Sequence, residues 1–166
     1  MEFMQNYIRA VKEDDVHKAL KKNTRQFSKF LKEIPRKKVD HAYAEGKWTI
    51  KEILQHIIDA ERVFTYRALS FARKDANPLP GFDENNWAAN SGGSQRKWDD
   101  LVKEFKDVRK ATEHLFGSFT DEQLRATGTA NGNLVNVLAL GFLPAGHVLH
   151  HMRIINERYL QKKRPA

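Results

Sequence analysis

The chain has 166 residues, of which 40% are hydrophobic and 30% charged, as in a soluble globular protein, and we expect a single domain over residues 1–166. No stretch approaches the roughly 20 apolar residues that span a membrane, and the acidic N-terminus "MEFMQNYIRAVKEDD" lacks a signal-peptide pattern, so we expect a cytoplasmic protein. The absence of cysteine excludes disulfides, cysteine-ligated zinc or iron–sulfur clusters, and a protein thiol nucleophile.

The first predicted helix spans residues 13–34 and is amphipathic. One face carries basic residues at spacings of three and four, and the opposite face is apolar. The basic residues are Lys18, Lys22, Arg25, Lys29, Lys32 and Arg36, and the apolar ones are Val16, Leu20, Phe27, Leu31 and Ile34. With a net charge of +8, this face could contact nucleic acid. The favoured interpretation is a solvated face behind a buried one.

The second predicted helix runs from about 49 to 74 and has a clear start signal. In "WTIKE", Thr49 and Glu52 form a capping box, and Trp48 and Ile53 occupy the positions of a hydrophobic staple. "NPLPGFDENN", residues 77–86, and the "NSGGSQ" that follows predict a long loop. Apolar residues at helical spacing then predict a third helix over about 94–117.

The segment after the third helix holds a short predicted helix capped by Thr120 and a glycine-bearing loop, "ATGTANGN". The last helix is expected from Leu134 to about Gln161, with Pro144 causing a kink, or a break after which the strong helix starts near Pro144. No strand pattern is apparent. The chain is therefore predicted to be an all-α four-helix bundle with a long connection between helices 2 and 3, so strict up-down-up-down order is not implied.

Three histidines gather in "GHVLHHMRIINERYL" near the C-terminus: His147, His150 and His151. His147 can chelate a metal together with His151, four residues on, or with His150, three residues on. Adjacent His150 and His151 cannot easily share an ion, and spacing alone does not choose between the two pairs. Since catalytic sites usually have three protein ligands, a third is needed.

The best third ligand is His56, which lies between Ile53 and Ile57 on the apolar side of the second helix. Metal sites in bundles are built from such inward side chains on facing helices. Asp59, three residues on, could accept the other N–H of a metal-bound imidazole. We expect the remaining histidines to be surface or loop residues: His17, His41 and His114.

Three segments, "AEGKWTIKEILQHIIDAERVFTYRAL", "PLPGFDENNW" and "GHVLHHMRIINERYL", resemble the DinB/YfiT-like superfamily of metal-dependent enzymes. The resemblance covers residues 43–160 and implies a four-helix bundle with one divalent ion per chain, most often zinc or nickel. Carried onto this sequence, the three histidine ligands of the family fall on His56, His147 and His151. The resemblance thus selects His151 over His150.

Some members of this superfamily transfer low-molecular-weight thiols such as bacillithiol or mycothiol. The resemblance therefore implies transfer of such a thiol to an electrophilic small molecule, and without cysteine the protein must take the thiol as a co-substrate. A metal-dependent hydrolase is the alternative, although the H-E-x-x-H motif of many peptidases is absent. A nucleic-acid-binding or stress-response protein with a structural metal is the second alternative. The oligomeric state stays open, a homodimer included.

Three further residues are candidates for the pocket: Asp83, Arg67 and His150. Asp83 could line the pocket or cap a turn or helix. Glu61 with Arg67 or Arg158 could bind an anionic substrate, but a structural ion pair is the favoured interpretation.

Overall fold

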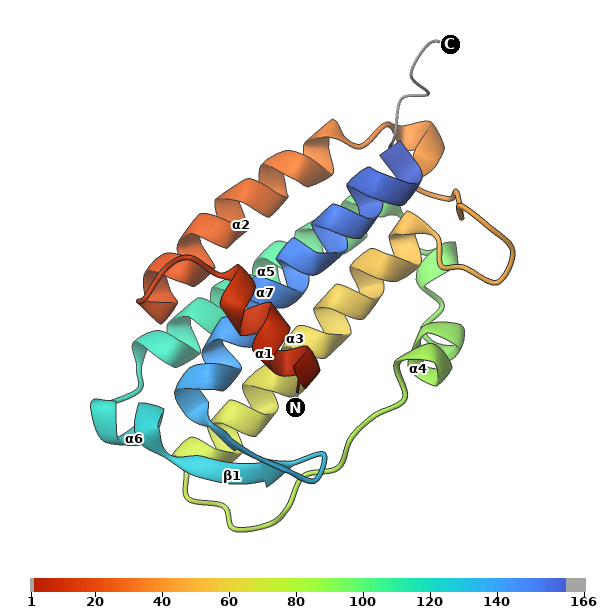
Figure 1. Ribbon diagram of the computed structural model, residues 1–166. Helices are drawn as coiled ribbons and strands as arrows, with labels where there is room; N and C mark the ends of the chain where they lie inside the picture. The colour runs from red at the N-terminus through yellow and green to blue at the C-terminus, as the bar shows by residue number, and fades with distance from the viewer. Residues whose placement is uncertain (1, 161–166) are drawn as a thin grey trace.

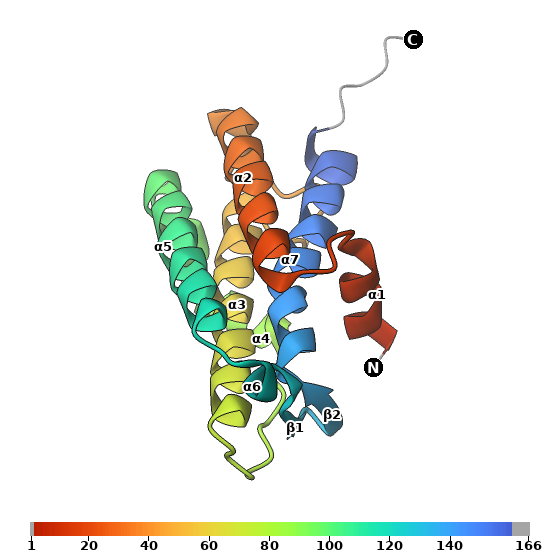
Figure 2. The ribbon, with the colours of Figure 1, turned by 90° about the vertical axis from the view of Figure 1, so that its left-hand side faces the viewer.

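Four long helices lie side by side and form the body of the molecule (Figure 1): α2 (Val16–Glu33), α3 (Ile50–Ala72), α5 (Trp98–Gly117) and α7 (Val137–Ile154). The structure is a computed structural model that describes residues 2–160. Helices α2 and α7 run in one direction and α3 and α5 in the other (Figure 2). The consecutive helices α3 and α5 are thus parallel, and the bundle departs from up-down-up-down order, as the long connection had allowed.

The start of α3 follows directly from the capping box. The Thr49 side chain accepts a hydrogen bond from the backbone N–H of Glu52, and the Glu52 carboxylate accepts one from the N–H of Thr49 at 2.7 Å. The predicted start of this helix is confirmed. Thr120 likewise caps the short helix α6 (Asp121–Arg125).

The connection over residues 73–97 returns the chain along the bundle and is more ordered than the predicted loop. It contains the helix α4 (Glu84–Asn90) and a 3-10 turn at Gly93–Gln95. The Asp83 side chain accepts hydrogen bonds from the backbone N–H groups of Asn85 and Asn86, both at 3.0 Å, and so caps α4. Of the two roles considered for Asp83, lining the pocket or capping a helix, these hydrogen bonds show the helix cap.

The predicted glycine-bearing loop is instead a β-hairpin, so the expectation of no strands was wrong. Strands β1 (Thr127–Ala130) and β2 (Asn133–Asn136) pair antiparallel. The turn residues Asn131 and Gly132 both have positive φ, 49° and 71°. Asn-Gly is the pair that two-residue hairpin turns favour, because both residues tolerate this conformation.

Helix α7 begins at Val137, capped by the side chain of Asn136, rather than at Leu134. It continues through Pro144 without a break and passes into one turn of π-helix at Ile155–Leu160. The predicted end at Gln161 lies outside the described residues. All positions from Leu140 to Val148 are buried, which makes α7 the central helix of the bundle.

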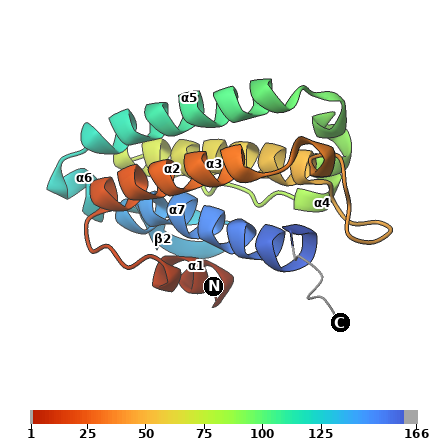
Figure 3. The same ribbon diagram turned by 90° about the horizontal axis from the view of Figure 1, so that it is seen from above.

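The short N-terminal helix α1 (Glu2–Ala10) was not predicted, because it is brief and lacks a clear capping signal. It packs across α7 on the outside of the bundle (Figure 3). A Cβ on Gly146 would lie 2.2 Å from the Tyr7 carbonyl oxygen. Glycine at this position therefore permits the close approach of the two helices.

A buried polar cluster separates two hydrophobic parts of the core. Glu61 pairs with Arg109, whose Nε and Nη2 donate to the two carboxylate oxygens at 2.7 and 2.9 Å. Thr112 donates to the same carboxylate, and Arg109 Nη1 donates to Asn23 Oδ1 at 2.8 Å. The structural ion pair predicted for Glu61 exists, but its partner comes from α5 and is neither Arg67 nor Arg158.

The basic residues of α2 are all exposed, and the five apolar residues opposite them are all buried. This is the pattern of a solvated face. Among the described residues, no helix is both long and apolar enough to cross a membrane.

Candidate metal centre

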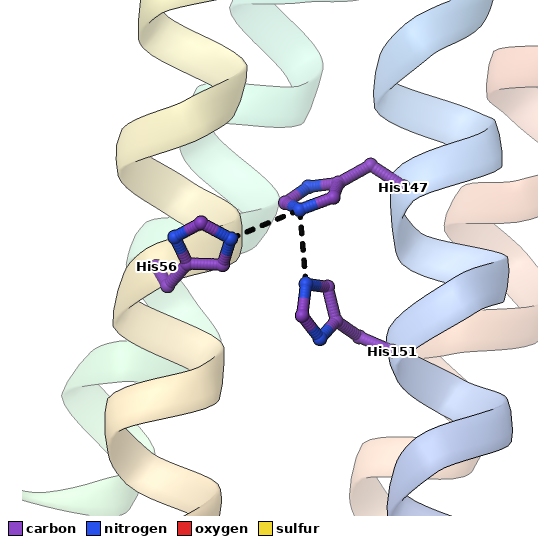
Figure 4. A group of neighbouring side chains, drawn as sticks. All are labelled: His56, His147 and His151. Carbon is purple, nitrogen blue, oxygen red and sulfur yellow. Dashed lines mark hydrogen bonds between the residues drawn. The ribbon is translucent and has the colours of Figure 1, made fainter. Parts of the chain in front are cut away.

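Three histidine rings converge between α3 and α7 (Figure 4). His56 projects from α3, and His147 and His151 project from successive turns of α7. The Nε2 atom of His147 lies 3.0 Å from Nε2 of His56 and 2.9 Å from Nε2 of His151. The ligand atoms of all three lie within 4.8 Å of one another. Because His147 and His151 are four residues apart, both lie on the same face of α7. The packing of α3 against α7 brings the ring of His56 to this face.

These three nitrogens fit a shared cation better than they fit one another. A neutral imidazole has one N–H donor and one lone-pair acceptor. His147 Nε2 can therefore make a good hydrogen bond to only one of its two neighbours, which leaves the other close contact without a good hydrogen bond. His151 Nδ1 is the only buried side-chain nitrogen or oxygen in the described part that has no hydrogen-bond partner. A divalent ion bound by the three Nε2 lone pairs would resolve the conflict at His147 Nε2, although it would give no partner to His151 Nδ1.

Burial keeps the three rings neutral, as metal ligands must be. Desolvation lowers the pKa of His56 from its ordinary value to about 4. Burial lowers the pKa of His147 and His151 well below the ordinary value as well, and the neighbouring histidines lower both further. The lone pairs are therefore available throughout the neutral range.

The same shifts predict how the stability of the metal-free protein depends on pH. In the unfolded chain each histidine has a pKa near 6.5 and is protonated below that pH. In the folded protein the same ring stays neutral until the pH reaches its lower pKa, so acid favours the unfolded state. The free energy of unfolding should thus be flat above about pH 7 and fall below pH 6.5, by up to about 1.4 kcal/mol per pH unit for each ring. Urea unfolding between pH 7.5 and 5 measures this slope.

The control is His56→Asn, which removes one of the three groups and should reduce that slope. A stability that stays constant between pH 7 and 5 would contradict the neutral, buried state of the cluster.

His150 is not part of this cluster. Its half-buried ring lies 5.2 Å from the ring of Tyr7, measured between centroids, and 5.1 Å from that of His151. It does line the adjacent cavity. The geometry therefore brings together the three residues that the family resemblance had selected, and places His150 beside them on the wall.

Asp59 was expected to accept a hydrogen bond from a histidine of the cluster, but it contacts other residues instead. Its Oδ1 accepts a hydrogen bond from Gln55 at 2.9 Å and lies 3.5 Å from a guanidinium nitrogen of Arg62. Burial raises its pKa, and the charges acting on it come from Arg62, Glu104 and Arg96. The carboxylate thus belongs to an ion-pair network between α3 and α5 and does not orient His56.

A cavity of about 450 Å³ opens beside the histidines. Of the three candidates for the pocket, Arg67 and His150 line this cavity. Asp83 caps α4, and its neighbour Glu84 lines the wall. Sequence reasoning also missed several lining residues from α1 and the hairpin: Tyr7, Asn131 and Asn133. The Asn-Gly turn could have indicated the hairpin, but nothing local indicated that it would border the cavity.

The fold and the cluster together define a four-helix bundle whose three histidines form a candidate metal site. The model of the DinB superfamily matches residues 19–155. The chain belongs to the DinB superfamily.

Curated relatives are similar at moderate identity. A protein of Oceanobacillus iheyensis named "Putative metal-dependent hydrolase" is 25% identical over 115 residues, which cover 67% of this chain and 65% of the relative, just under two thirds. A Bacillus cereus protein of the same description is 26% identical over 129 residues, covering 76% of this chain and 73% of that relative.

Two solved structures share the fold. YfiT from Bacillus subtilis, described as a probable metal-dependent hydrolase with an unusual four-helix bundle topology, superposes with a TM-score of 0.73 at 16% identity, covering 87% of this chain and 83% of its own. A mycothiol-dependent maleylpyruvate isomerase superposes with a TM-score of 0.72 at 13% identity, and the match covers 88% of this chain and 61% of the isomerase chain. At these identities the likeness concerns the fold alone.

Proposed function

We propose that this protein is a metal-dependent enzyme that joins a low-molecular-weight thiol to an electrophilic small molecule. The observation that carries the proposal is the convergence of three neutral histidine nitrogens beside a cavity of about 450 Å³. Cavities of this size suit small-molecule ligands. His56, His147 and His151 would hold one divalent ion, with zinc or nickel as the first candidates.

A divalent ion bound there would supply Lewis acidity, which lowers the pKa of a coordinated thiol or water. The chain itself supplies the rest of the site. Apolar side chains of Trp48, Phe64 and Leu143 line the cavity and would exclude water from the electrophile. No cysteine is present, so the sulfur must come from a co-substrate.

In the proposed reaction, the thiol sulfur forms a bond to an electrophilic carbon as the bond from that carbon to its leaving group breaks. The thiol proton leaves to solvent together with the leaving group. A free thiol of pKa about 8.5 is only a few per cent ionised at pH 7, so ionisation limits the uncatalysed reaction. Holding both reactants in one cavity would contribute the larger share of any acceleration.

Metal-dependent hydrolysis is the second candidate, and two observations favour it. The curated relatives carry the name of metal-dependent hydrolase. Glu84 is the only acidic residue in the described part that lines the cavity, and its charge acts on His56. A carboxylate in this position could serve as the general base for an attacking water.

One pair of assays separates the two reactions. The metal-loaded protein is offered bacillithiol, mycothiol, glutathione or coenzyme A with monobromobimane or chlorodinitrobenzene, and in parallel a panel of esters, amides and lactones. We expect metal-dependent consumption of at least one thiol, which falls to the uncatalysed rate in His56→Ala. The matched control is His114→Ala, which removes an exposed histidine on α5 and should leave the rate unchanged.

Metal-dependent hydrolysis without thiol consumption would replace the first candidate by the second. If neither panel reacts, the enzyme proposal fails.

A further inference from the structure

Arg67 is a buried cation on the wall of the same cavity. Its residue is only 6% exposed, and it follows His56, Ala60 and Phe64 along the face of α3 that lines the cavity. Arginine is rarely buried to this degree unless it is paired. The position of Arg67 therefore calls for a partner.

The protein supplies only part of that partner. Arg67 Nη2 donates one hydrogen bond, at 2.7 Å, to the backbone carbonyl oxygen of Pro80. Among the described residues, no carboxylate lies within ion-pair distance of Arg67, whereas Arg109, which is fully buried, is held by both oxygens of Glu61. A guanidinium carries five N–H donors, so the bond to Pro80 uses only a small part of the hydrogen-bonding capacity of Arg67.

Among the described residues, Glu84 is the only acidic residue on the cavity wall, and it interacts with other groups than Arg67. The charge of Glu84 acts on His56 and on Tyr7. Burial lowers the pKa of Arg67, and within the described part of the chain no carboxylate charge opposes this shift. Burying an unpaired cation is costly, and an anion that enters the cavity would remove that cost.

We propose that Arg67 binds the carboxylate of the small molecule that occupies the cavity, so that the electrophilic substrate is an organic anion. The inference rests on the proposed function for the reaction, but the binding site itself requires only Arg67 and the cavity. Arginine presents a planar fork of donors that matches the two oxygens of a carboxylate.

The spacing along α3 indicates how such a substrate lies. Arg67 follows His56 by eleven residues, which corresponds to a rise of about 16 Å along the helix axis. Long helical side chains lean toward the helix N-terminus and so toward the histidines. A substrate with its carboxylate on Arg67 would extend past Ala60 and Phe64 and present its other end to the histidine cluster.

Calorimetric titration with simple probes tests the inference without any catalysis. Hexanoate and the neutral, similarly shaped hexanamide are titrated into the zinc-loaded protein and into metal-free His56→Ala. We expect hexanoate to bind roughly 10- to 100-fold more tightly than hexanamide in both proteins, the range expected for hydrogen bonds to a charged group. Binding in the metal-free variant excludes a carboxylate that merely coordinates the metal.

Variants on α3 assign the effect to Arg67. Arg67→Gln should abolish the preference for hexanoate, and Arg67→Lys, which keeps the charge but loses the fork, should retain part of it. The matched control is Arg62→Gln, since Arg62 lies on the same helix but pairs with Glu104 outside the cavity. Its hexanoate preference should equal that of the parent protein, and thermal melting verifies that each variant is folded.

Three results would overturn the inference: equal binding of hexanoate and hexanamide by the parent protein, hexanoate binding that requires zinc, or a preference that survives Arg67→Gln. A preference for butyl phosphate over hexanoate, lost in Arg67→Gln, would replace the carboxylate by a phosphate. None of these outcomes depends on whether the thiol or the hydrolysis assay succeeds.

Discussion

The His147→Ala variant should bind zinc or nickel more than about 100-fold more weakly than the parent protein, a larger effect than the 10- to 100-fold typical of residues that only support a ligand. His147 Nε2 lies within 3.0 Å of a nitrogen of each of the other two histidines, so its removal leaves a pair instead of a triad. Competition with a coloured chelator measures the affinity, and elemental analysis gives the metal content.

The sharper comparison is between neighbours on α7. His151→Ala should lose the metal as His147→Ala does, while His150→Ala should retain about one ion per chain. If His150→Ala loses the metal as completely as His151→Ala, the assignment of His151 is wrong.

Replacing Glu61 by glutamine should lower the free energy of unfolding by about 3–5 kcal/mol, because it leaves the cation of Arg109 buried without its counter-charge. The Arg109 side chain is 0% exposed and that of Glu61 is 1% exposed, so water cannot take the place of the carboxylate. Urea unfolding of the metal-free protein at pH 7.5 measures the loss.

Glu104→Gln is the control, since Glu104 pairs with Arg62 and Arg96 at the partly exposed boundary of the same helices. It should cost no more than about 1 kcal/mol. The double variant Glu61→Leu/Arg109→Met removes both charges and should recover much of the loss. Equal costs for Glu61→Gln and Glu104→Gln would show that the buried pair contributes no more than the exposed one.

The polar cluster also bears on the metal centre. Asn23 donates to the carbonyl oxygen of Ala145 at 3.2 Å, and Arg109 donates to that of Pro144 at 3.4 Å. Both contacts hold α7 just before His147. The continuous helix through Pro144 is thus supported by hydrogen bonds from α2 and α5, which a reading of α7 alone could not reveal.

The main helices and the histidine cluster could be predicted from the sequence because their signals are local and periodic. The capping box of Thr49 and Glu52 locates the start of α3, and the apolar residues around His56 turn it toward the bundle core. The spacing of His147 to both His150 and His151 left a real choice, which family resemblance resolved and the geometry of the cluster supports.

The other parts of the site depend on contacts between distant segments. Asp59 can reach Gln55, His56 or Arg62 on its own helix, so local spacing does not choose among them. The contact of Arg62 with Glu104, which ties this group to α5, is not visible from that spacing. Arg109 likewise gives no local sign that it will face Glu61. The hairpin had a local signal in Asn131–Gly132, but its strands are short and lack a regular apolar alternation.

X-ray absorption spectroscopy of the zinc-loaded protein tests the central claim most directly, because it reports the atoms that surround the ion. We expect one ion per chain with three histidine nitrogens among its ligands in the parent protein and in His150→Ala. We also expect His147→Ala to lose this three-histidine signature. A spectrum dominated by oxygen ligands in the parent protein, or one unchanged in His147→Ala, would contradict a metal centre built from His56, His147 and His151.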